Sequence, residues 1–253
     1  MFLCIIKEDM RDFFEEKGFV PSKKILIFDL KQICALLICV AFGISMMFIS
    51  SKLDDKGVYN LILVLASLNL FMITLRVINY KLIIHKFNRA TDLPLHFCSF
   101  NVILCFIGVV MNSYAILDFV FSVSPVMALV ALIMPEGQAG KYPHFGCFRC
   151  WEYYYSHTCL ILVPLLAAKY LDFTPSFEYM IPCAWLFVIM LAVGAAANYY
   201  TKGNYMYISH APKISAAVAV EKAVGKVVYR MILISAIILL YFVAHYTAPL
   251  LGI

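Results

Sequence analysis

The chain has 253 residues, of which 64% are hydrophobic and only 14% are charged. A soluble domain carries about a quarter charged residues, so this composition excludes an ordinary globular protein. The net charge of +5 is not concentrated in a basic and aromatic groove, and we expect no nucleic-acid partner.

Residues 1–29 are predicted to form an amphipathic segment that lies at the membrane interface. Its apolar residues, such as Phe2 and Phe13, alternate with charged ones, as in interfacial helices. Lys7, Glu8 and Asp9 interrupt the first apolar run, so we expect no cleavable signal peptide. Residues 30–253 are predicted to form a single transmembrane domain.

Seven segments of that domain are apolar enough to cross the hydrocarbon core, which requires about 20 residues of helix. They are residues 32–51, 58–80, 93–111, 114–134, 151–170, 177–199 and 231–251. The sequence therefore predicts an all-α, polytopic transmembrane helix bundle of about seven spans.

The distribution of basic residues predicts the orientation of the bundle. With seven spans and a cytoplasmic N-terminus, all Lys and Arg residues except Lys52, Lys56 and Lys169 fall on the cytoplasmic side. Basic flanks resist translocation, which favours this arrangement. Arg76, near the inner end of the second span, is expected to extend toward the lipid headgroups.

Ionisable and nucleophilic residues inside spans are costly, and so they indicate candidate functional sites. In chain order these are His96, Cys98, Ser99, Asp118, His157, Asn198 and His245. In the predicted topology Cys98 and His157 lie at the same depth, about 7–10 Å from the inner boundary. Asn198 and the loop residues His144, Asn204, Tyr205 and His210 fall near the same inner end. Asp118 falls in the opposite leaflet and is interpreted as paired, protonated or interfacial.

A thiol and an imidazole at one depth suit acyl transfer. A neighbouring histidine can remove the proton of a cysteine thiol, and amide or hydroxyl donors can stabilise the oxyanion that then forms. Cys98 and His157 are therefore the candidate nucleophile and base. Cys98 can equally be a packing residue, because free cysteine is often buried and other spans also contain cysteines.

Cys147 and Cys150 have the spacing of metal ligands, with His144 as the nearest third group. A structural zinc site normally needs four ligands. We interpret the pair as two reduced cytosolic thiols, and we expect no metal site.

Several strings of residues resemble a known family. They are 93–99 (LPLHFCS), Tyr142-Pro143, 156–158 (SHT), Asn198, and 203–207 (GNYMY) followed by Pro212. Together they resemble the YwaF-like bacterial membrane proteins, which are similar to the animal transmembrane-protein-164 acyltransferases and more distantly to the androgen-induced-gene and ADTRP hydrolases. The motifs extend from about residue 93 to residue 215.

The resemblance implies a catalytic cysteine at Cys98, a catalytic histidine at His157 and transfer of a fatty acyl group between membrane lipids. It also implies a multi-pass protein of the bacterial cell membrane. The more distant hydrolases have threonine where this chain has Cys98, so both transfer and hydrolysis stay open. His96, Ser99, Asn198, Asn204, Tyr205 and His144 are candidate substrate-binding or oxyanion residues. This chemistry requires no cofactor, and the sequence predicts no particular oligomeric state.

Two other classes of function remain open. A seven-span transporter or sensor would bind a small solute at the same inner polar cluster, although the chain has no internal repeat of the kind found in many transporters. A membrane scaffold without chemistry would tolerate replacement of His157.

Overall fold

The structure is a computed structural model, and it describes residues 28–83, 87–134, 145, 147–212 and 214–252. The amphipathic segment predicted for residues 1–29, apart from its last two residues, and the candidate residue His144 lie outside this part of the chain.

Seven α-helices make up most of the described chain, which contains no strand. They are α2 (Leu30–Ser50), α3 (Asp55–Ile78), α4 (Phe97–Val110), α5 (Tyr114–Ile133), α6 (Phe148–Tyr170), α7 (Met180–Thr201) and α8 (Ser215–Thr247). Short helical turns follow or precede them: η2 (Asn79–Ile83), η4 (Phe177–Tyr179), η5 (Tyr205–Tyr207) and η6 (Ala248–Leu251). Each α-helix overlaps one predicted span, which confirms the expected helical membrane bundle.

Five of these helical segments are long and apolar enough to cross a membrane by themselves: α2, α3, α5, α7 with the preceding turn, and α8. Their outer faces carry large exposed apolar side chains, such as Phe48, Trp185 and Leu239, each more than 60% exposed. An apolar surface of this extent requires lipid around it.

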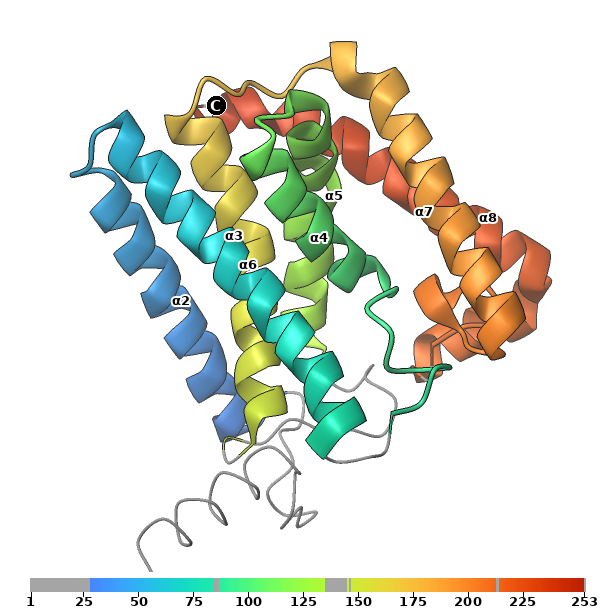
Figure 1. Cartoon of the computed structure of the whole chain (residues 1–253). Helices are drawn as coiled ribbons and strands as arrows, with labels where there is room; N and C mark the ends of the chain where they lie inside the picture. The colour runs from blue at the N-terminus through green and yellow to red at the C-terminus, as the bar shows by residue number, and fades with distance from the viewer. Residues whose placement is uncertain (1–27, 84–86, 135–144, 146, 213, 253) are drawn as a thin grey trace, which may run out of the picture.

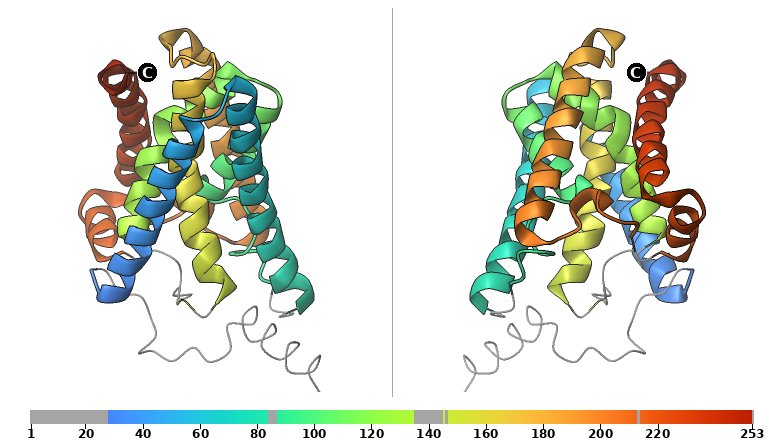
Figure 2. Two further views of the ribbon diagram at one scale, coloured as in Figure 1. Left: turned by 90° about the vertical axis from the view of Figure 1, so that its left-hand side faces the viewer. Right: turned by 90° about the vertical axis from the view of Figure 1, so that its right-hand side faces the viewer.

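Helix α6 occupies the centre of the bundle and packs against α2, α3, α4 and α5. It is drawn in yellow between the other helices in both side views (Figure 2). Most of its side chains are buried, including Glu152 and His157. Its polar residues therefore face other helices and not lipid. Helices α7 and α8 lie on the opposite side of α5 from α2 (Figure 1).

Two helices depart clearly from the predicted spans. Helix α8 begins at Ser215, 16 residues before its predicted span of residues 231–251. Helix α4 departs in the opposite sense. A span was expected over residues 93–111, but the helix begins only at Phe97 and has 14 residues. Pro94 disfavours helical backbone at the residue before it and cannot donate a helical hydrogen bond. At about 1.5 Å per residue α4 is about 21 Å long, which is shorter than the hydrocarbon core of about 30 Å. Its N-terminus therefore lies partway along the bundle (Figure 1).

Candidate functional site

The first turn of α4 presents backbone donors inside the bundle. His96 precedes the helix in an extended conformation, and its side chain forms no capping hydrogen bond. The N–H of Phe100 donates to the carbonyl of His96 at 2.9 Å. The N–H groups of Phe97, Cys98 and Ser99 therefore have no acceptor within the helix. The positive end of the helix dipole adds to their attraction for a negative charge.

Cys98 lies in this first turn. With Ile161 it packs against a cluster of Ile73, Val102, Ala128 and Leu160 from four helices. From the helix bounds, Cys98 lies about 18 Å before the end of α4, and His157 about 20 Å before the end of α6. The cluster that Cys98 packs against includes Leu160, which lies about one turn along α6 from His157. Cys98 therefore lies near the level of His157 along α6.

His157 is buried in α6, and its ring is held by Tyr153. The Nδ1 atom lies 2.7 Å from the carbonyl oxygen of Tyr153, and the two ring centroids are 4.4 Å apart. A carbonyl only accepts hydrogen bonds, so Nδ1 carries the proton, and in the neutral ring Nε2 holds a lone pair. Among the described residues no hydrogen bond joins Nε2 to another group or joins Cys98 to His157, and the dyad stays a prediction.

A buried charge cluster that the sequence analysis missed lies beside these residues. Glu152 is 1% exposed and accepts a hydrogen bond from Arg76 at 2.8 Å and another from Arg149. Arg76 also donates to the hydroxyl of Ser99 at 3.4 Å. The expectation that Arg76 extends to the headgroups is therefore wrong, because its guanidinium turns inward and joins α3, α4 and α6.

A signal for this cluster was present in the sequence. Arg76 and Glu152 are opposite charges near the inner ends of two predicted spans. Charged residues within a membrane commonly pair with one another. The pairing cannot be assigned from either helix alone, because the two residues lie on different spans.

The loop after α7 docks on the connection that precedes α4, and Tyr205 forms the contact. Its side chain is fully buried, and its hydroxyl donates to the carbonyl of Arg89 at 2.5 Å and accepts from the N–H of Leu93 at 3.1 Å. Burial raises the pKa of Tyr205, which keeps the hydroxyl protonated. At Gly203, a Cβ atom would lie 2.5 Å from the carbonyl oxygen of Ala90. Only glycine allows the two segments to approach this closely.

The two asparagines expected as oxyanion donors hold this loop in shape. The Asn198 amide donates to the Tyr205 carbonyl at 3.0 Å and accepts from the Tyr205 N–H at 2.6 Å. The Asn204 amide donates to the His210 carbonyl at 2.8 Å, and its oxygen accepts from the N–H groups of Ser209 and His210. Their role as oxyanion donors stays a prediction.

His96 lies between the start of α4 and this loop. Its ring centroid is 5.2 Å from that of Tyr205 and 5.5 Å from that of Tyr207. Lys202, Met206 and Tyr207 have positive φ angles, a conformation that costs energy for residues with a side chain. Such local strain is often found at functional sites.

A second polar cluster lies toward the other end of the bundle. Oδ1 of the fully buried Asp118 is 3.0 Å from Nε2 of His245 and accepts from the N–H of Ser176 at 3.1 Å. The thiol of Cys183 donates to Oδ2 at 3.4 Å. Of the three interpretations of Asp118, the structure supports the paired one. The cluster joins α5, α7, α8 and the segment before η4.

The cysteines at 147 and 150 are both buried. Within the described part of the chain, no group of three or more His, Cys, Asp or Glu residues has a geometry that could hold a metal. His144, the third residue of that motif, lies outside it.

These observations define a helical integral membrane protein. Cys98 in the first turn of α4, His157 of α6 and the buried charge cluster of Arg76, Arg149 and Glu152 lie in the same part of the bundle. The chain belongs to the TMEM164 family, which matches residues 27–247. This match includes the first two helices and most of α8, which the motifs alone did not reach. Comparison with curated proteins and with solved structures gives no match.

Proposed function

We propose that the protein is an intramembrane acyltransferase, or an acyl-lipid hydrolase, in which Cys98 is the nucleophile and His157 the general base. The observation that carries this proposal is the orientation of His157. Its Nδ1–H is committed to the carbonyl of Tyr153, which leaves the lone pair of Nε2 to accept a proton. A fixed tautomer with one basic nitrogen is what general-base catalysis by histidine requires.

The first half-reaction forms a thioester. Nε2 of His157 takes the proton of the Cys98 thiol while the sulfur bonds to the ester carbonyl carbon of a membrane lipid. The tetrahedral intermediate then collapses, the carbon–oxygen bond to the lipid breaks, and His157 returns the proton to the departing alcohol. The products are an acyl thioester at Cys98 and a lysolipid.

The second half-reaction releases the acyl group. The hydroxyl of an acceptor lipid attacks the thioester, His157 accepts its proton, and the proton returns to the sulfur as the carbon–sulfur bond breaks. With water as the attacking group the same steps give a free fatty acid. The reaction is a transesterification or a hydrolysis, and it needs no change of oxidation state.

The oxyanion of each intermediate needs hydrogen-bond donors that are already in position. The N–H groups in the first turn of α4 are the first candidates. They form no hydrogen bond within the helix, and one of them belongs to Cys98 itself. The Ser99 hydroxyl is a further candidate. Asn198 and Asn204 are further candidates, although each amide already donates to a backbone carbonyl.

The test is turnover of a phospholipid acyl donor by purified variants. Cys98→Ser and His157→Ala should each remove most of the activity, and the double variant should lose little more, because residues that act as a unit are strongly non-additive. Cys105→Ser is the matched control, since Cys105 is a buried cysteine about two turns further along the same helix. If Cys98→Ser keeps full turnover, the nucleophile is wrong. If His157→Ala keeps it, the base is wrong.

A further inference from the structure

The side chain of Arg76 joins three helices beside the candidate catalytic residues. Arg76 lies near the end of α3, and its Nη1 donates to Oε1 of Glu152 on α6 at 2.8 Å. Its Nη2 donates to the hydroxyl of Ser99 on α4 at 3.4 Å. The side chain of Arg76 is 11% exposed and that of Glu152 is 2% exposed, so the contacts lie inside the bundle. One planar guanidinium therefore connects the first turns of α4 and α6.

On α4, the bond from Arg76 reaches the turn that contains the candidate nucleophile. Ser99 follows Cys98 directly. Among the described residues, no other helix sends a side-chain hydrogen bond to residues 97–100. At 3.4 Å the bond is longer than the usual N–H···O bond, but the charge of the guanidinium strengthens it. Arg76 therefore restrains the position of Cys98 and of the backbone donors in its turn.

On α6, the bond from Arg76 reaches the turn that orients the candidate base. Glu152 directly precedes Tyr153, whose carbonyl oxygen lies 2.7 Å from Nδ1 of His157. Glu152 also accepts a hydrogen bond from Arg149, three residues earlier in the helix. Charge-assisted bonds to two guanidiniums hold this carboxylate firmly. Arg76 therefore restrains the part of α6 whose backbone sets the orientation of the His157 ring.

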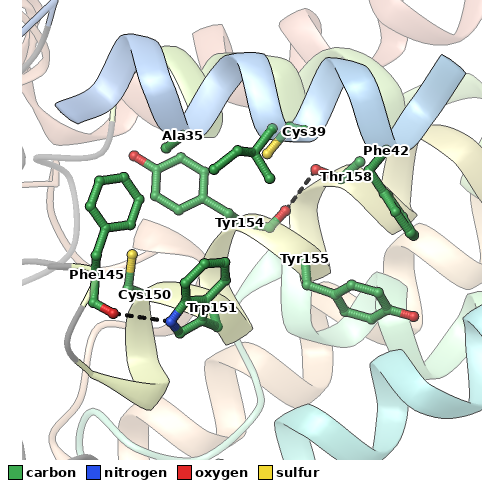
Figure 3. A pocket seen from close by; sticks show the side chains of 10 residues that line it. Ala35, Cys39, Phe42, Phe145, Cys150, Trp151, Tyr154, Tyr155 and Thr158 are labelled. Carbon is green, nitrogen blue, oxygen red and sulfur yellow. Dashed lines mark hydrogen bonds between the residues drawn. The ribbon is translucent and has the colours of Figure 1, made fainter. Parts of the chain in front are cut away.

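The face of α6 toward α2 is held in a different way. Tyr154 and Thr158 line an apolar pocket on that side, and Figure 3 shows them beside Cys39 and Phe42 of α2. The Thr158 hydroxyl donates back to the Tyr154 carbonyl at 2.7 Å, within α6 itself. Apolar packing is non-directional, whereas a hydrogen bond fixes a distance and an angle. In the described part of the chain, Arg76 is the one side chain that bonds to both α4 and α6.

These two contacts require arginine at this position. The terminal nitrogens of arginine lie in one fixed plane, so Nη1 can bond to Glu152 while Nη2 bonds to Ser99. Lysine has a single terminal nitrogen on a flexible chain. Lysine in place of Arg76 would keep a positive charge opposite Glu152 but would lose the fixed connection to Ser99. The change from arginine to lysine therefore separates the pairing of charges from the alignment of the two helices.

We propose that Arg76 is a positioning residue for the acyl-transfer reaction. Through Ser99 and Glu152 it holds the turn of α4 that carries Cys98 against the turns of α6 that orient His157. This role rests on the proposed function, and it requires no contact between Arg76 and the substrate. A nucleophile and a base on separate helices react only in the correct geometry, and a misplacement of about 1 Å can cost about a hundredfold in rate.

Steady-state kinetics of phospholipid turnover by the purified full-length protein tests this role, with thermal unfolding measured on the same preparations. Arg76→Lys should lower kcat for each folded molecule by about ten- to a hundredfold. KM should stay unchanged, and the unfolding midpoint should stay close to that of the wild type, because the charge opposite Glu152 remains. Arg230→Lys is the matched control, since Arg230 is exposed on α8 and donates to the carbonyl of Ser209 at the same 3.4 Å. It should keep the kcat of the wild type.

Ser99→Ala is the second variant, and it keeps the ion pair of Arg76 with Glu152 if Arg76→Lys does not fold. It should also lower kcat, and the double variant should lose little more than either single one, because both changes break the same contact. Hydrogen exchange of residues 97–103 should become faster in both single variants, while that of residues 115–130 on α5 should not change. The exchange measurement does not depend on turnover.

Three results would overturn the positioning role and leave the proposed nucleophile intact. The first is a wild-type kcat in Arg76→Lys. The second is a loss that consists only of a raised KM or a smaller folded fraction. The third is an additive loss in the double variant, which would show that Ser99 acts without Arg76. Full turnover by Cys98→Ser would instead overturn the proposed function, and the positioning role would fall with it.

Discussion

Two buried histidines in this protein have the same local structure and different surroundings. In His157 and in His245, Nδ1 lies 2.7 and 2.8 Å from the carbonyl oxygen four residues earlier in the helix. The difference is at Nε2, which in His245 lies 3.0 Å from Asp118 and in His157 has no partner among the described residues. The arrangement of His245 suits a structural ion pair, and the arrangement of His157 suits a general base.

Asp118 is predicted to stabilise the fold without contributing to turnover. Asp118→Ala removes the partner of His245, Cys183 and the Ser176 N–H together. Loss of one partner of a buried pair typically costs about 3–5 kcal/mol. We expect a clear drop in the midpoint of thermal unfolding in detergent, with near-normal turnover for each folded molecule. Asp55→Ala, at an exposed acid, is the control, and an unchanged midpoint for Asp118→Ala would contradict the structural role.

The sequence predicted which residue types deserved attention, but not their partners. Cys98 and His157 stand out in the sequence because ionisable and nucleophilic groups are rare inside spans. The pairing of Arg76 with Glu152, and of Asp118 with His245, depends on which helix faces which. A hydropathy pattern does not contain that information, because nearly all residues of a span are apolar and the pattern does not show which face packs against which neighbouring helix.

At the scale of elements, the short helix α4 and the loop after α7 form one unit. Pro94 delays the start of α4, and the connection before it is held by Tyr205 and approached closely by Gly203. The motif strings identified both segments from the sequence. Their contact could not be predicted, because they are about 110 residues apart in the chain.

Gly203→Ala is predicted to loosen this unit. The new Cβ would lie 2.5 Å from the Ala90 carbonyl oxygen, so the loop must move away from the connection before α4. Hydrogen exchange of residues 87–97 should become faster, and turnover should fall by up to about a hundredfold, because a misplacement of positioning groups by about 1 Å can have such an effect. Gly43→Ala, where the nearest atom is a side-chain carbon of Leu162 at 3.6 Å, should change neither. Unchanged exchange in Gly203→Ala would show that this contact does not hold the segment.

At the scale of the whole molecule, each predicted span overlaps one helix, because long apolar runs constrain the chain strongly in lipid. The central position of α6 was not predictable. It is the least apolar of the long helices, with Arg149 and Glu152 in its first turns, and it tolerates them because its neighbours cover it. Its ends were predicted to within a few residues, while its surroundings required the structure.

The orientation in the membrane is still a prediction, and it is open to a direct test. Single cysteines at Lys52 and at Lys226, both exposed, are introduced into a chain whose nine native cysteines are replaced. In intact cells an impermeant maleimide should label the first site and not the second. In permeabilised cells it should label both. Labelling of the second site alone in intact cells would show that the orientation is the reverse of the predicted one. Labelling of both sites would show that the predicted number of spans between them is wrong.

The central claim is that Cys98 carries the acyl group during the reaction, and mass spectrometry of the trapped enzyme tests it most directly. Purified protein is mixed with a phospholipid of defined acyl chain, quenched in acid within the first turnover and digested. The account predicts that the peptide containing Cys98 gains the mass of that acyl group and loses it in neutral hydroxylamine, which cleaves thioesters. Cys98→Ala should give no such adduct, and Cys105→Ala should give the full amount. Turnover of the lipid with no acyl adduct on Cys98, or with the adduct on another cysteine, would contradict the account.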